Sequence, residues 1–173
     1  MTPDSVGPLS RPVIVARLPP GGMEVDLRAT GEECAALAAD LKLPEVKSLE
    51  ARFRLTGKPE RVHVAGRITA EIVQICVVTL DPFDSRLDEE VEVDFEEPRP
   101  DERADPRADL DLAQDGPDEI VDGRIDIGAL AAEFLALGLD PYPRKPGVDF
   151  SYEERDPGDN PFARLAELKT DKS

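Results

Sequence analysis

Few side chains in this sequence are capable of nucleophilic, acid–base or metal chemistry, and they do not form matched sets. The single histidine, His63, lies between arginines, and the two cysteines, Cys34 and Cys76, are far apart in the chain. A Cys–His or Ser–His pair, or a zinc site, needs partners that the spacing does not supply. Glycine-rich phosphate loops and an EF-hand loop are also absent from the sequence. We therefore expect no enzyme activity, no metal, no cofactor and no small-molecule substrate.

Basic side chains alternate with apolar ones in two neighbouring segments, 49–55 and 62–68. A period of two is typical of strands, and the turn residues 57–60 would join them as an antiparallel hairpin. The side chains expected on the outer face of this hairpin are Arg52, Arg54, Arg61, His63 and Arg67. Two interpretations stay open. The face binds RNA phosphates, or it is a solvated face whose arginines pair with acids on adjacent strands.

The acidic charge is concentrated in one part of the chain. The chain has 21 Lys and Arg against 38 Asp and Glu, a net charge of −17. Residues 81–122 hold eighteen acidic residues and four arginines, so this segment alone carries −14. A strand is expected over 86–95, with a row of acidic side chains directed outward: Asp88, Glu90, Glu92 and Asp94. This charge opposes a phosphate backbone and indicates either a basic partner or a role in solubility alone.

In the N-terminal part, a first strand is expected over 11–18. Thr30 and Glu33 have the spacing of a capping box, which satisfies backbone donors at the start of a helix. The helix that follows has one apolar stripe and is expected to end at Pro44. Cys34 lies in this stripe, so we expect a buried thiol that packs rather than reacts.

The C-terminal part combines strands with one strongly apolar helix. The hairpin's second strand is expected to continue through 72–78, where alternation is lost, which indicates either two covered faces or a bulge. A turn is expected at 81–85 and a short strand at 120–125. Asp126 is expected to cap a helix over 127–139, too short to span a bilayer and therefore packed in the core.

These elements predict an α+β fold, with a mostly antiparallel twisted sheet or partial barrel and two packed helices. We expect a flexible N-terminus over 1–10 and a domain over 11–145, with a mobile acidic insertion at 96–118 that is too polar to form a core. A polar linker with a short helix is expected over 146–173. The protein is expected to be monomeric. It is also expected to be cytoplasmic, because it lacks a disulfide framework and a long apolar run.

Three stretches, 66–83, 125–145 and 160–169, together resemble the YceD family of bacterial large ribosomal RNA subunit accumulation proteins, in its alphaproteobacterial-type branch. The positions that carry the resemblance are Cys76, Leu80, Asp81, Pro82, Asp126, Leu130, Asp140, Pro141, Tyr142, Arg144, Lys145, Asn160, Pro161 and Phe162.

The resemblance implies a non-enzymatic role in accumulation of large-subunit rRNA, and hence in ribosome biogenesis. Many members have Cys-x-x-Cys-Leu where this chain has Thr79 in place of the second cysteine, so a metal or redox role of that pair does not carry over. Cys76 is expected to pack within the sheet. The implied partners are large-subunit precursor rRNA, a basic ribosomal protein, or both. The alternatives are a binding module or holdase for a basic protein, without RNA contact, and a degenerate redox or zinc protein.

Overall fold

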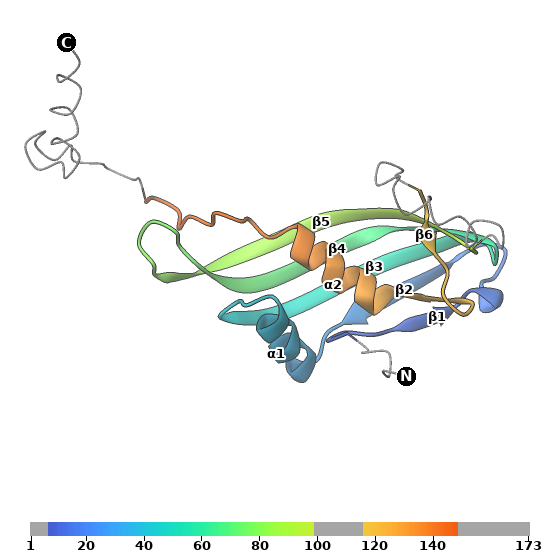
Figure 1. Cartoon of the computed structure of the whole chain (residues 1–173), viewed down its shortest axis with the longest axis horizontal. Coiled ribbons are helices and arrows are strands. Elements are labelled where there is room, and N and C mark those ends of the chain that lie inside the picture. The colour runs from blue at the N-terminus through green and yellow to red at the C-terminus, as the bar shows by residue number, and fades with distance from the viewer. Residues whose placement is uncertain (1–6, 99–115, 149–173) are drawn as a thin grey trace, which may run out of the picture.

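The computed structural model describes residues 7–98 and 116–148, which form an open five-stranded sheet, a small two-stranded sheet and two α-helices (Figure 1). The large sheet has the order β2-β3-β4-β5-β6, and only the β5–β6 pair is parallel. The elements are β1 (Pro12–Ile14), the 3₁₀ helix η1 (Val15–Arg17), β2 (Met23–Arg28), α1 (Gly31–Asp40), β3 (Glu45–Lys58), β4 (Arg61–Ile75), β5 (Pro82–Glu96), β6 (Asp118–Glu119), β7 (Arg124–Asp126) and α2 (Ile127–Leu137). The predicted α+β class is confirmed, and the sheet does not close into a barrel.

Three long strands, β3, β4 and β5, form an antiparallel meander at the centre of the sheet. Their side chains alternate between the two faces, as the period of two requires. On one face Phe53, Leu55, Val62 and Val64 are completely buried, and they belong to the single hydrophobic core. The predicted hairpin is therefore confirmed, with Lys58 opposite Arg61 at its turn.

Both helices lie on the core side of the large sheet, and within residues 7–98 and 116–148 no helix covers the opposite side (Figure 1). The predicted capping box starts α1. The Thr30 hydroxyl accepts the Glu33 N–H at 3.3 Å, and the Glu33 carboxylate accepts the Thr30 N–H at 2.8 Å. Cys34 is buried in the core, as predicted. The helix ends at Asp40, before Pro44, because the chain turns at Lys42 with a φ of 56°.

Asp126 caps helix α2, as predicted, and the Asp126 carboxylate accepts the N–H groups of Gly128 and Ala129. The same carboxylate accepts hydrogen bonds from the Ser10 hydroxyl and the Arg11 N–H, so it also holds the segment that precedes β1. The helix ends at Leu137, two residues earlier than expected, and Leu137 is 71% exposed. The helix is therefore buried along one side rather than all round.

Two short strands differ from the sequence prediction. The strand expected over 11–18 ends at Ile14, because its partner β7 is only three residues long, and the chain then forms the 3₁₀ helix. Of the strand expected over 120–125, only residues 124–125 form a strand, as part of β7, and β6 lies just before the expected range. A turn separates these two, with positive φ values at Asp122 and Gly123, the latter a residue that adopts this conformation readily.

Strand β2 was not predicted, although Met23, Val25 and Leu27 alternate with charged residues. The strand expected to continue through 72–78 does so only as far as Ile75, and the bulge suggested for this stretch is not found there. The register between β4 and β5 is unbroken as far as Ile75, and the bulge lies in β3, at Lys47 between Val46 and Ser48.

The turn between β4 and β5 lies earlier than the sequence suggested. The chain reverses over residues 76–81, with Leu80 at a φ of 61°, and Pro82 is already paired with Ile75. A proline is tolerated at the first position of a strand at a sheet edge, because its missing N–H is not needed there. The turn expected at 81–85 is therefore wrong.

Neither α1 nor α2, the helices of the described part of the chain, combines the length and apolar character needed to cross a membrane. The predicted mobile insertion lies mostly outside the described residues, and its ends, Glu96 and Asp118, lie in β5 and β6. The predicted C-terminal helix, with Asn160, Pro161 and Phe162, lies wholly outside them.

Candidate functional site

We call the side of the five-stranded sheet opposite the helices the outer face. The charged side chains that surround the predicted basic residues on this face are Glu24, Asp26, Arg28, Glu50, Arg52, Arg54, Arg61, His63, Arg67, Asp88, Glu90, Glu92, Asp94 and Glu96. The structure thus brings all five predicted basic residues together on one face. It also adds the acidic side chains of β2, which sequence reasoning missed together with that strand.

One row of charges crosses four strands in register. Asp26 on β2 is opposite Arg52 on β3, Arg52 is opposite Arg67 on β4, and Arg67 is opposite Glu90 on β5. Arg52 Nε is 2.6 Å from Asp26 Oδ1, and the Arg67 guanidinium is 2.7 Å from Glu90 and 3.0 Å from Asp88. Like charges directly opposite are destabilising, and the carboxylates at both ends of the row offset that cost.

The hydrogen bonds in this row act on the arginines in the same direction. The hydrogen bond to Asp26 raises the pKa of Arg52, and the hydrogen bond to Glu90, with the charge of Asp88, raises the pKa of Arg67. Both guanidiniums therefore hold their protons more tightly than a free arginine does.

The other three predicted basic residues also have acidic partners. Arg54 is 3.5 Å from Glu24. Arg61 is 3.1 Å from Glu96, and His63 Nδ1 is 2.9 Å from Asp94 Oδ1. Cross-strand pairing with acids, one of the two interpretations left open by the sequence, thus describes the geometry of all five side chains.

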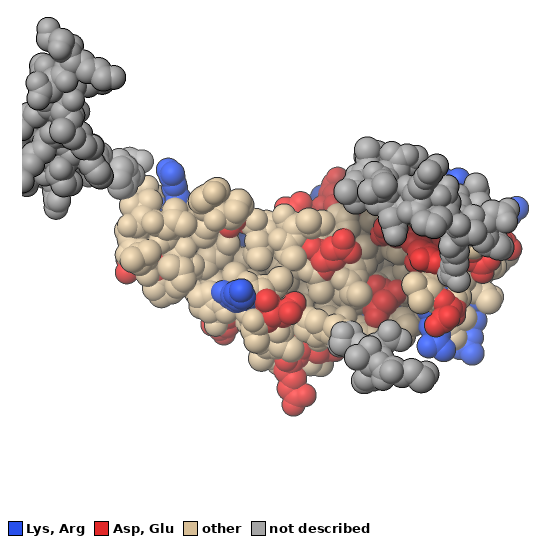
Figure 2. Space-filling model, viewed as in Figure 1, with Lys and Arg blue, Asp and Glu red and all other residues tan. Residues whose placement is uncertain are grey.

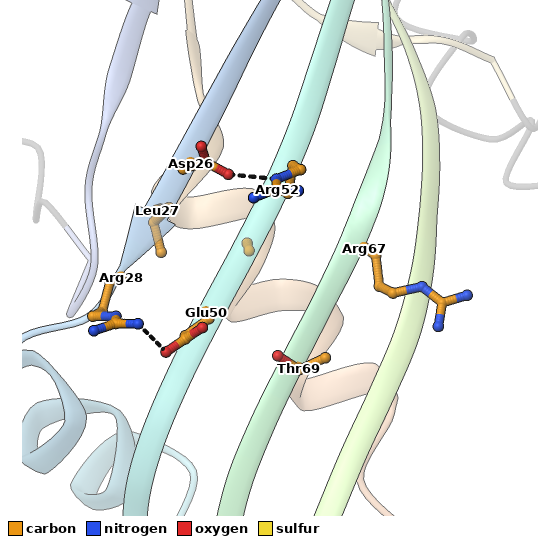
Figure 3. Close-up of a pocket in the computed structure, with 8 residues that line it drawn as sticks. Asp26, Leu27, Arg28, Glu50, Arg52, Arg67 and Thr69 are labelled. Atoms are coloured by element: carbon orange, nitrogen blue, oxygen red, sulfur yellow. Dashed lines mark hydrogen bonds and ion pairs between the residues drawn. The ribbon is translucent and has the colours of Figure 1, made fainter.

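A shallow hollow of about 560 Å³ lies on the outer face between β2, β3 and β4 (Figure 3). Two ion pairs flank it, Arg52 with Asp26 and Arg28 with Glu50, the latter at 2.7 Å. The hollow is lined by Asp26, Leu27, Arg28, Glu50, Ala51, Arg52, Arg67 and Thr69. The third arginine of the lining, Arg67, pairs with Asp88 and Glu90 on β5, so every charged side chain that lines the hollow has an oppositely charged partner.

Strand β5 carries the acidic side of the outer face. Its four carboxylates at alternate positions, Asp88, Glu90, Glu92 and Asp94, have side chains that are 43%, 82%, 81% and 45% exposed. The Glu92 carboxylate lies 3.8 Å from His63 Nε2. This row therefore retains acidic groups that can still be approached from solvent.

The turn between β4 and β5 holds Cys76, whose thiol is fully buried. The Lys145 N–H donates to Cys76 Sγ at 3.4 Å. This hydrogen bond and those from Thr79 lower the pKa of the Cys76 thiol to about 7. The sequence predicted that Cys76 packs within the sheet. This prediction is wrong, because Cys76 lies in the turn that follows β4.

Two stretches that carry the family resemblance meet at this turn. The Val77 N–H donates to the Pro143 carbonyl at 2.9 Å, and the side-chain amide of Gln74 donates to the Asp140 carbonyl at 3.5 Å. Asp140 in turn accepts the Tyr142 N–H. The same two stretches carry exposed large apolar side chains, among them Ile75, Val77, Leu80 and Tyr142. Figure 2 shows this end of the molecule with few charged side chains.

The remaining resemblance positions support the fold. Asp126 caps α2, Leu130 is buried in the core, and Asp81 accepts the Cys76 N–H through its carbonyl. Within the described residues no group of three His, Cys, Asp or Glu side chains is arranged to hold a metal ion.

Comparison with known proteins gives one match. A family model described as large ribosomal RNA subunit accumulation protein YceD matches residues 64–169, more than half of the chain. No curated protein and no solved structure matches. The match covers β4 from Val64 onward, β5 with its acidic row, and the turn at Cys76. It leaves four of the five predicted basic residues outside: Arg52, Arg54, Arg61 and His63. The chain therefore belongs to the YceD family of large ribosomal RNA subunit accumulation proteins.

Proposed function

We propose that this chain acts in large-subunit rRNA accumulation as a non-enzymatic factor, by binding a basic ribosomal protein on the acidic side of the outer face. The observation that carries the proposal is the charge balance around the arginines. Four guanidiniums on β3 and β4 are surrounded by seven carboxylates on β2 and β5: Glu24, Asp26, Asp88, Glu90, Glu92, Asp94 and Glu96.

This balance disfavours a phosphate backbone as the main ligand. Affinity for nucleic acid comes from Lys and Arg that displace counterions from phosphates. Here a phosphate would have to displace the carboxylates already paired with Arg52 and Arg67, and it would meet the exposed carboxylate of Glu92. A cationic protein surface meets the opposite situation, because acidic side chains on β5 attract it over a distance of about 10 Å at ordinary salt.

Direct contact with precursor rRNA is the second candidate, and one observation favours it. Arg52 and Arg67 are direct cross-strand neighbours, and Arg54 and Arg61 project from the same face. A partner with enough phosphates could exchange the intramolecular ion pairs for its own, because exposed ion pairs contribute little to stability.

Two charge variants separate the candidates. In the acidic-row variant, Asp88 and Asp94 become Asn, and Glu90 and Glu92 become Gln. In the arginine variant, Arg52, Arg54, Arg61 and Arg67 become Glu. Both variants are compared with the wild type for binding to extracted large-subunit proteins and to large-subunit rRNA fragments, at two salt concentrations. A thermal melt of each variant is the folding control.

The proposal expects the acidic-row variant to lose the ribosomal protein while the arginine variant keeps it. The RNA candidate expects the wild type to bind rRNA fragments and the arginine variant to lose them, with the salt dependence flattened by about one unit per contact removed. Binding of basic proteins that is equal in the wild type and the acidic-row variant would refute the proposal. Sedimentation of cell extract would then show whether the chain migrates with large-subunit precursors at all.

A further inference from the structure

Strand β5 has one long side without a partner strand. Its pairing with β4 is continuous from Pro82 to Glu96, but on its other side only Phe95 and Glu96 pair, with β6. Over residues 7–98 and 116–148, no strand is bonded to this side of β5 from Pro82 to Asp94. An edge of this length is a template for pairing with another chain.

The hydrogen bond at the end of β5 shows which backbone groups face this edge. The Glu96 carbonyl accepts the Ile120 N–H at 2.8 Å, on the side away from β4. In an antiparallel pair the backbone groups of successive residues point alternately to one side and to the other. Since the register with β4 is unbroken, the N–H and C=O groups of Asp88, Glu90, Glu92 and Asp94 also face the free edge.

The side chains beside this edge define what it would accept. The residues whose backbone groups face the edge are Asp84, Arg86 and the four members of the acidic row of the outer face. On the core side, Leu87 and Val91 are buried, Val93 is half-buried, and the half-buried Glu89 lies between the first two. Along the acidic row, an added strand would therefore place one set of alternate side chains beside carboxylates and the other set beside side chains that are apolar except for Glu89. A second copy of β5 would bring carboxylate against carboxylate, which is unfavourable.

We propose that the free edge of β5 binds an extended segment of a basic protein as an additional strand, with Lys or Arg alternating with apolar β-branched residues. In this mode of recognition the main-chain hydrogen bonds supply affinity and the alternate side chains supply specificity. The inference rests on the proposed function for the basic character of the partner and adds the way in which the partner binds. Strand β6 already uses the same edge at its far end.

The probe is a seven-residue peptide that alternates Lys and Val, with blocked ends. Two further peptides carry N-methyl groups, one on all lysines and one on all valines. Either set of N–H groups, but not both, faces β5 in an added strand. Strand addition therefore expects one methylated peptide to bind about tenfold or more weakly than the other, because several hydrogen bonds are lost. Purely electrostatic attraction expects the two to bind equally.

A pair of protein variants tests the same edge by changing β5 instead of the peptide. Glu92→Pro removes an N–H that faces the edge and none that bonds to β4, and Glu92→Gln removes the same charge but keeps the N–H. The peptide is expected to bind Glu92→Gln at least about tenfold more tightly than Glu92→Pro. In the wild type, bound peptide is expected to slow hydrogen exchange at Glu90, Glu92 and Asp94. A thermal melt checks that Glu92→Pro is folded, and the methylated peptides decide the question if it is not.

The outcomes separate the two proposals. Equal binding of both methylated peptides overturns strand addition. If the acidic-row variant then still fails to bind basic ribosomal proteins, the proposed function stands. Failure of the unmodified peptide to bind, while extracted large-subunit proteins bind, also overturns strand addition alone. If neither the peptide nor the extracted proteins bind the wild type, both proposals fall.

Discussion

Replacing Asp126 by Ala tests how the start of α2 is held to the rest of the fold. The carboxylate accepts four hydrogen bonds, from the Ser10 hydroxyl and from the N–H groups of Arg11, Gly128 and Ala129, the last three at 2.6, 2.9 and 3.1 Å. Loss of an N-cap costs about 1 kcal/mol. Each of the two bonds to the N-terminal segment contributes about another 1 kcal/mol. We therefore expect Asp126→Ala to lower the free energy of unfolding by about 3 kcal/mol.

The measurement is urea and thermal unfolding, in which a loss of this size lowers the Tm by on the order of 10 °C for a domain of this length. Asp126→Asn keeps an oxygen that can cap the helix but loses the charge, so it should lose about half as much. Asp40→Ala, at the exposed end of α1, is the matched control and should change stability by less than about 0.5 kcal/mol.

The effect of Asp126 should also depend on pH. Burial alone would raise the pKa of this carboxyl, but the hydrogen bonds from Ser10, Arg11, Ala129 and Gly128 hold it below its ordinary value of 3.8. A carboxyl whose pKa is lower in the folded state stabilises the protein above its unfolded pKa, and this contribution is lost as the pH falls through the folded pKa. The gap between wild type and Asp126→Ala should narrow in acid. An Ala variant as stable as the wild type at pH 7 would refute the reasoning.

Two other substitutions test single contacts. Gly66→Ala should destabilise the sheet by several kcal/mol, on the order of the largest single-site effects, because a Cβ at Gly66 would lie 2.2 Å from the Arg52 carbonyl oxygen. The control is Gly31→Ala, whose added Cβ would meet nothing within 4 Å. Equal melting temperatures of the two variants would contradict the close packing at Gly66. Glu33→Gln should remove part of the acid sensitivity of folding, because the hydrogen bonds from Arg11 and Thr30 lower the pKa of Glu33 to about 2. The contribution of Glu33 to stability is therefore present above pH 4.5 and is lost as the pH falls toward 2. If the wild type and Glu33→Gln lose stability equally between these pH values, the expectation is wrong.

The parts of the fold that the sequence predicted are those fixed by local chemistry. Thr30 and Glu33 specify the start of α1 by their spacing alone, and Asp126 does the same for α2. The alternation around Phe53 and Val64 specifies which face of the hairpin is buried.

The errors arise where tertiary pairing decides. Pro82, next to Asp81 and Asp84, has the composition of a turn, and only its position opposite Ile75 at the start of an edge strand makes it part of β5. Strand β1 is cut short by the length of its partner, which is far away in the chain.

Only part of the candidate site could be predicted, because the rest depends on how the strands pair. The outer positions of Arg52 and Arg67 follow from the period of two. Their neutralisation depends on Asp26, which lies on a strand that was not predicted, and on the register with Glu90. Charge compensation is a property of the paired strands, so it could not be read from one segment.

The pairing of β1 with β7 sets the order in which the chain can assemble during synthesis. The meander of β3, β4 and β5 joins neighbours in sequence, whereas Ile14 must wait for Arg124, about 110 residues later. At a synthesis rate of about 5–20 residues per second, β1 has no partner for roughly 5–20 s after it is made. Because contacts between distant residues carry the larger loop-closure cost, we expect exchange protection at Val13 and Ile125 to appear after that of Val62 and Val64 in pulse-labelled refolding. Strand β1, synthesised before the other described strands, would then be among the last of them to pair.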